Sequence, residues 1–157
     1  MENKKNYGEI AKNYFKEGYN CCQAVVAAFS QEDWFIKSGL TLDTAVKIAS
    51  SFGGGMGRLR EVCGAVSGMF FVIGLKHGYL PSSSTEQEDK KSHYQLIQDL
   101  AQEFKSFNGS IICRELLALN QKGASEPTPE KRTEEYYKKR PCADLVEIAS
   151  NIVAKYV

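Results

Sequence analysis

The longest apolar stretch of this chain runs from Val62 to Leu75. It is too short to cross a bilayer, for which about 20 residues are needed. Charged residues bound it on both sides, so we interpret it as a buried helix at the centre of the fold, expected over 61–76. Gly64 and Gly68 lie four residues apart within it, which would let another backbone pack closely against one face of the helix.

Most of the remaining sequence repeats its apolar residues at helical spacing, and it has no alternating strand pattern. Asn20 with Gln23, and Thr85 with Glu88, have the spacing of capping boxes, which begin helices. The expected helices cover 7–18, a segment from 21, 41–52, 61–76, 85–108, a short segment from 113, 128–140, and 142 to the C-terminus. We therefore expect an all-α fold, a single-domain helical bundle of about six to eight helices over residues 1–157.

The charge of the chain is nearly balanced, with 20 Lys and Arg against 19 Asp and Glu. This balance argues against nucleic acid and anionic membranes as partners, because both require a basic surface. The N-terminal segment has no apolar region of the kind found in secretory signals, so we expect a cytoplasmic protein without membrane insertion. Stable structural disulfides are uncommon in the cytoplasm, which favours metal or redox roles for the cysteines.

Four of the five cysteines, Cys21, Cys63, Cys113 and Cys142, each stand at the start of an apolar stretch with helical spacing. This pattern places each sulfur in the first turn of a helix, where unpaired amides and a partial positive charge favour the thiolate. Four such sulfurs that met in one place would form a metal site or two redox pairs. The alternative is that they are small buried packing residues, as cysteines often are. Cys22 lies one step round its helix, and we interpret it as a packing residue or a spare thiol.

A glycine-rich segment, Gly53-Gly54-Gly55-Met56-Gly57-Arg58, precedes Cys63. It lacks the Gly-Lys-Ser/Thr of a P-loop, and no strand precedes it, so nucleotide binding is not expected. Its bare amides could form an anion-binding nest, and Arg58 and Arg60 would add positive charge. The candidate cofactor-binding residues are Gly53, Gly54, Gly55, Gly57, Arg58 and Gly64. The alternative is a helix C-cap followed by a tight turn.

Other polar residues give weaker signals. His77 and His93 are the only histidines, and we interpret both as structural. The segment 130–140 mixes both charge signs, as a solvated helix face does. No Ser-His-Asp or Cys-His-Asp arrangement can be assembled, so an enzyme that uses a single reactive cysteine has little support.

Several of these segments match the pattern of a known family: residues 18–25, 52–57, 63–68, 113–116 and Cys142. They resemble the C_GCAxxG_C_C family of redox-active proteins, which has four cysteines and a Cys-Gly-Ala-x-x-Gly motif. The resemblance implies a helical fold and assigns the four family cysteines to Cys21, Cys63, Cys113 and Cys142. A similar module is associated with the split-Soret cytochromes, which implies electron transfer.

The leading hypothesis is a redox or electron-transfer protein whose four cysteines serve as catalytic residues or as metal ligands. They would hold an iron–sulfur cluster or zinc, or cycle between dithiol and disulfide without a cofactor. The expected partner is a redox protein of unknown identity, and exposed tyrosines leave room for a homo-oligomer. The alternative is a non-catalytic helical binding or scaffold module with buried structural cysteines.

Overall fold

The structure of the protein is a computed structural model that describes residues 4–157. The first three residues of the segment on which the cytoplasmic location was predicted lie outside this range. In chain order the elements are α1 (Tyr7–Lys16), α2 (Cys21–Ala28), α3 (Asp33–Lys37), α4 (Leu42–Ala49), the 3-10 turn η1 (Ser50–Phe52), α5 (Gly53–Met56), α6 (Gly64–His77), α7 (Glu86–Asn108), α8 (Cys113–Leu116), α9 (Glu134–Lys139) and α10 (Cys142–Val153). The predicted all-α fold class is confirmed.

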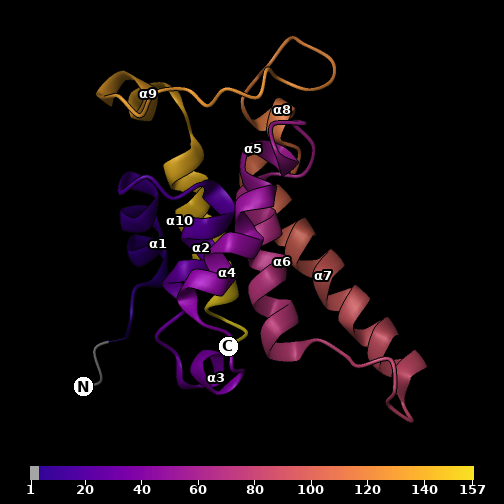
Figure 1. Ribbon diagram of the computed structural model, residues 1–157. Coiled ribbons are helices and arrows are strands. Elements are labelled where there is room, and N and C mark those ends of the chain that lie inside the picture. The colour runs from indigo at the N-terminus through magenta and orange to yellow at the C-terminus, as the bar shows by residue number, and fades with distance from the viewer. Residues whose placement is uncertain (1–3) are drawn as a thin grey trace.

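Four helices form the centre of the bundle: α1, α2, α6 and α10 pack against one another around one continuous core (Figure 1). As predicted from its composition, α6 is the apolar helix of this core, and it contacts α2, α10 and α7. Its small residues act as expected. A Cβ atom added at Gly68 would lie 2.9 Å from the carbonyl oxygen of Cys22, so only glycine lets α2 and α6 approach this closely.

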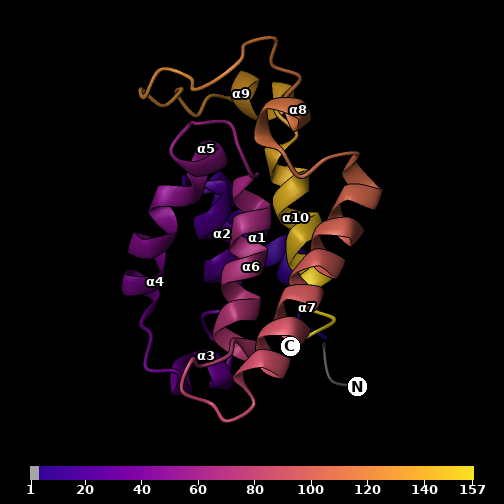
Figure 2. The same ribbon diagram turned by 90° about the vertical axis from the view of Figure 1, so that its right-hand side faces the viewer.

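The two ends of the bundle differ. In Figures 1 and 2, α5, α8 and α9 lie at one end, and the loop between α8 and α9 arches over that end. α3 lies at the opposite end, and α7 diverges from the bundle along its side. Only Leu100 and Phe104 of α7 are fully buried, because this helix packs against α6 and α10 on one side alone.

Helix starts follow the sequence signals in most places. Asn20 and Gln23 form the predicted capping box at α2, with the Gln23 amide donating to Asn20 Oδ1 over 2.9 Å. At Thr85 the capping box is wrong, because the hydroxyl donates to Asp89 Oδ2 instead of accepting an amide.

Two helix boundaries and one additional helix differ from the prediction. The helix expected at 128–140 begins only at Glu134, where Thr133 supplies the cap. The central helix begins at Gly64 instead of residue 61, and the short helix α3 was not predicted.

Candidate functional site

The four predicted cysteines line one cavity of about 290 Å³ at the end of the bundle that carries α5, α8 and α9. Cys21, Cys113 and Cys142 are the first residues of α2, α8 and α10, and Cys63 is the N-terminal cap of α6. The predicted helix-start positions are therefore confirmed. The cavity is the place where four segments that are distant in sequence bring their thiols together.

A short backbone bridge aligns two of these cysteines. Val62 and Ile112 form an isolated antiparallel β-bridge. Next to it, the amide of Cys63 donates to the carbonyl of Ile111 over 2.8 Å, and the amide of Cys113 donates to the carbonyl of Glu61 over 2.6 Å. This pairing holds Glu61 and Val62 in the bridge instead of a helix, which explains why α6 begins later than predicted. It also fixes the two helix starts side by side.

The glycine segment forms the cavity wall beside this bridge. Residues 54–58 all have left-handed backbone angles, with φ between +63° and +70°, so the segment is not a regular helix, as predicted. A Cβ atom added at Gly55 would lie 2.6 Å from Cβ of Cys113 and 2.9 Å from Cα of Arg60. Glycine is thus required for the loop to pack directly on Cys113. All six candidate cofactor-binding residues line the cavity, while their role stays a prediction: Gly53, Gly54, Gly55, Gly57, Arg58 and Gly64.

Backbone strain is concentrated at this wall. Four non-glycine residues among those described have a positive φ, and three of them, Met56, Arg58 and Arg60, belong to this loop and its exit. Each such residue destabilises the fold by about 1–3 kcal/mol, and such residues cluster at functional sites. The loop therefore keeps backbone angles that are unfavourable for its non-glycine residues.

Cys21 and Cys142 influence each other's pKa. The interaction with the Cys21 thiol is the main influence that lowers the pKa of Cys142 below its usual value. The charges of Arg140, Arg132 and Arg60 act in the same direction, while burial opposes them. The same interaction and burial raise the pKa of Cys21 well above its usual value. The pair therefore consists of a thiolate-prone sulfur and a thiol that stays protonated.

Like Cys21, the other two cavity cysteines do not follow the prediction that every helix start favours the thiolate. Burial raises the pKa of Cys63 to about 12, although the first-turn amides of Ala65 and Val66 act against it. Burial also raises the pKa of Cys113, against the hydrogen bond and charge of Arg60. Desolvation outweighs the helix-terminal field at both sites, a balance that depends on tertiary burial and is invisible in the sequence.

Cys22 lies outside the cavity lining. Its side chain is fully buried in the core, and burial, followed by the charge of Cys63, raises its pKa to about 12. Of the two alternatives for Cys22, the structure supports the packing residue. His77 and His93 also lie outside the lining; Nε2 of His77 contacts the Tyr156 carbonyl oxygen at 2.6 Å.

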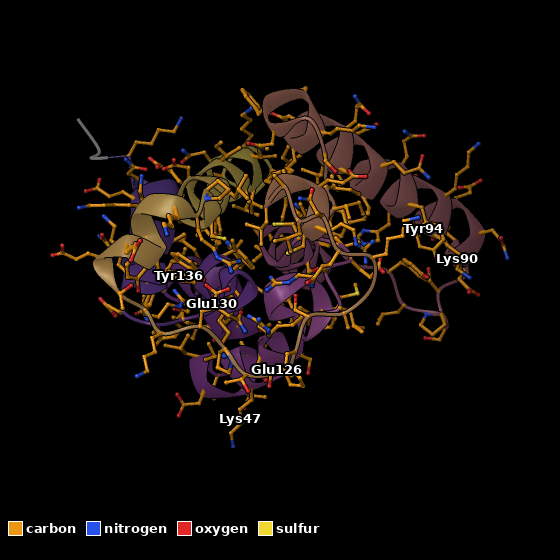
Figure 3. All side chains as sticks on the ribbon, turned by 90° about the horizontal axis from the view of Figure 1, so that it is seen from above. Lys47, Lys90, Tyr94, Glu126, Glu130 and Tyr136 are labelled. Atoms are coloured by element: carbon orange, nitrogen blue, oxygen red, sulfur yellow. The ribbon has the colours of Figure 1, made fainter. Side chains whose placement is uncertain are left out.

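Sequence reasoning missed two cavity arginines. The segment 130–140 was predicted to be a solvated helix face, but Arg132 and Arg140 both line the cavity. Arg132 stacks over Phe15, 4.4 Å from the ring centroid, and donates to the carbonyls of Phe15 and Tyr19. The tyrosines within this segment could have indicated that its arginines are partly buried, because Arg132 stacks on Tyr136 as well. Arg140 connects two further lining residues, because it pairs with Glu130 and stacks over Tyr136. Figure 3, which views the molecule from the cavity end, labels Tyr136 and Glu130 on the side away from Lys90 and Tyr94 of α7.

The arrangement of the four cavity cysteines bears on whether they could hold a single metal ion. Within residues 4–157, no three Cys, His, Asp or Glu side chains are grouped so that they could hold one ion. All five cysteines are free thiols. A tetrahedral zinc ion, one of the predicted alternatives, would therefore need the side chains to move.

Over the described part of the chain, no helix combines the length and apolar character that spanning a bilayer requires.

Comparison with known proteins gives one match. No curated protein and no solved structure matches the chain. A family model described as "Putative redox-active protein (C_GCAxxG_C_C)" matches residues 19–156. This span includes the glycine loop, all five cysteines and the four helix starts round the cavity. The chain therefore belongs to the C_GCAxxG_C_C family, as its cysteine pattern indicated.

Proposed function

We propose that the protein carries out thiol–disulfide exchange, with Cys21 and Cys142 as the pair that is oxidised and reduced. The observation that carries this proposal is the placement of Cys21 and Cys142, the first residues of α2 and α10, at the wall of one cavity. There the interaction with Cys21 lowers the pKa of Cys142. Both sulfurs stand at helix starts, and three arginines direct positive charge toward Cys142. The family description supports a redox role in general terms.

The reaction follows from these roles. The Cys142 thiolate attacks one sulfur of an external disulfide, forms a mixed disulfide, and releases the other half as a thiolate. The Cys21 thiol then loses its proton and attacks the Cys142 sulfur, which releases the second half. The protein gives up two electrons and becomes disulfide-bonded, and the external disulfide becomes two thiols. Closing the bond requires the two sulfurs to approach to about 2.05 Å.

The test is a redox titration with an uncharged buffer couple. Reduced protein is equilibrated anaerobically with mixtures of 2-mercaptoethanol and its disulfide, quenched by alkylation, and analysed by mass spectrometry of peptides. We expect a single two-electron transition in which Cys21 and Cys142 become linked. Cys142→Ser should abolish it. Because Cys21 and Cys22 share a tryptic peptide, Cys22→Ala serves as the matched control and should keep the transition.

Two results would overturn the proposal. One is a pair that stays reduced at every buffer ratio while circular dichroism shows a folded protein. The other is a link that forms between different cysteines.

A second candidate is an iron–sulfur cluster held by Cys21, Cys63, Cys113 and Cys142. The observation that favours it is the convergence of all four sulfurs on one cavity, since a dithiol pair needs only two. Bound there, the cluster would supply one-electron transfer. Anaerobic purification followed by iron and acid-labile sulfide analysis tests it. Stoichiometric iron and sulfide, lost in Cys63→Ser, would favour the cluster over the dithiol pair, and their absence would remove it.

A further inference from the structure

The cavity concentrates positive charge beyond what the chain as a whole carries. The net charge of the protein is only +1, yet four of its five arginines line this cavity, together with a single carboxylate, that of Glu130. No lysine belongs to the lining. The arginines come from two separate segments, with Arg58 and Arg60 in the glycine loop region and Arg132 and Arg140 in the segment around α9.

Most of this charge is uncompensated. Over residues 4–157, Arg140 pairs with Glu130, but no carboxylate lies within ion-pair distance of Arg58, Arg60 or Arg132. Arg60 is the most deeply buried of these three arginines, with only 3% of its surface exposed. Its Nε donates to Ser125 Oγ over 2.8 Å, and its Nη1 lies 3.6 Å from the Cys113 sulfur. Burial of a guanidinium without an anion is strongly unfavourable, so a site of this kind is completed by a negative ligand.

The arginines are also held rigidly. Arg132 is fixed between Phe15 and Tyr136 by stacking and by two backbone carbonyls. A charge held in advance loses little entropy when it binds an anion. The volume of about 290 Å³ is that of a site for a small molecule, not for a segment of a folded protein.

We infer that the cavity binds a small organic disulfide that carries carboxylate groups, anchored by Arg60 and Arg132 beside Cys142. This inference rests on the proposed thiol–disulfide exchange and names its substrate class. The anchored disulfide presents a sulfur to Cys142, the mixed disulfide forms, and one acidic thiolate leaves. Attack by Cys21 then releases the second acidic thiolate, so that two electrons pass from the protein to the substrate.

The test compares three disulfides that differ in charge: 2,2′-dithiodiacetate, bis(2-hydroxyethyl) disulfide and cystamine. Each rate of oxidation of the reduced protein is divided by the rate for a neutral model thiol, which removes the intrinsic reactivity. We expect the normalised rate for the dianion to exceed that for the neutral disulfide about 10-fold, with cystamine slowest. Arg60→Gln and Arg132→Gln should reduce this preference, whereas Arg114→Gln, which changes the one arginine outside the lining, should keep it.

A measurement on the unaltered protein keeps the test decisive if the arginine variants do not fold. Adipate, a dicarboxylate without a disulfide, should slow the alkylation of Cys142 by iodoacetamide at constant ionic strength, and the neutral adipamide should not. Equal normalised rates for the three disulfides, without protection by adipate, would overturn the inference and leave the proposed function standing. Failure of all three to oxidise the Cys21–Cys142 pair would overturn the proposed function instead.

Discussion

The packing of the glycine loop on Cys113 gives the sharpest stability prediction. Gly55→Ala requires alanine to adopt φ +70° and places its Cβ 2.6 Å from Cβ of Cys113, well inside the usual contact distance of about 3.5–4.0 Å. The new atom would also lie 2.9 Å from Cα of Arg60 and 2.9 Å from the amide nitrogen of Glu61. These are backbone atoms, which cannot rotate away. The backbone strain destabilises by about 1 kcal/mol, and the overlap adds about 1–3 kcal/mol.

Gly57→Ala is the matched control. Gly57 also has a left-handed backbone, with φ +63°, but a Cβ there would have only Ser51 O within 4 Å, at 3.8 Å. This variant should be destabilised by the backbone strain alone, about 1 kcal/mol. The measurement is urea unfolding followed by circular dichroism. With a slope of about 2 kcal/mol/M, the midpoint of Gly55→Ala should lie about 0.5–1.5 M below that of Gly57→Ala. Equal midpoints would refute the direct packing of the loop on Cys113.

Three further outcomes are expected. Asn20→Ala removes the capping box at α2 and should destabilise the protein by about 1 kcal/mol in urea unfolding, whereas an unchanged midpoint would mean that the cap contributes nothing. Cys22→Ala should remove one thiol from the total counted in denaturant but none of the thiols that react in the folded state, because Cys22 is fully buried; loss of a reactive thiol would contradict this. Burial and the hydrogen bond to Glu32 raise the pKa of Tyr7 from 10.0 to about 12, so its protonated form is favoured in the folded state. Stability should therefore decline as the pH rises from about 10 to about 12, and Tyr7→Phe should reduce this decline in unfolding experiments.

The helices and the cysteine positions could be predicted because their signals are local. Asn20 caps α2 through a residue three positions away, and each cavity cysteine precedes its own apolar helix face. The sequence therefore identified the four cysteines that line the cavity, together with the glycine loop that lines it as well.

The features that the sequence did not predict depend on tertiary contacts. The bridge between Val62 and Ile112 joins segments separated by the whole of α6 and α7, and no local sequence pattern predicts it. Arg132 sits in a mixed-charge segment that usually faces water, and only the placement of Phe15 and Tyr136 around it turns it toward the cavity. Burial raises the pKa of both Cys142 and Cys63, but only Cys142 has Cys21 and three arginines close enough to lower its pKa, although both cysteines stand at helix starts.

The bridge between Val62 and Ile112 also determines where the chain can accept insertions. Residues 64–111 leave the cavity through α6 and return through α7, and their base is closed by the hydrogen bonds beside Val62 and Ile112. The turn at 78–85, which joins α6 to α7, therefore lies at the far end of a long segment whose two ends are held together by this bridge (Figure 2). Doubling the length of a loop adds only about 0.6 kcal/mol of closure entropy. Residues inserted into the turn at 78–85 should therefore be tolerated, and the spacing of the thiols that line the cavity should stay the same.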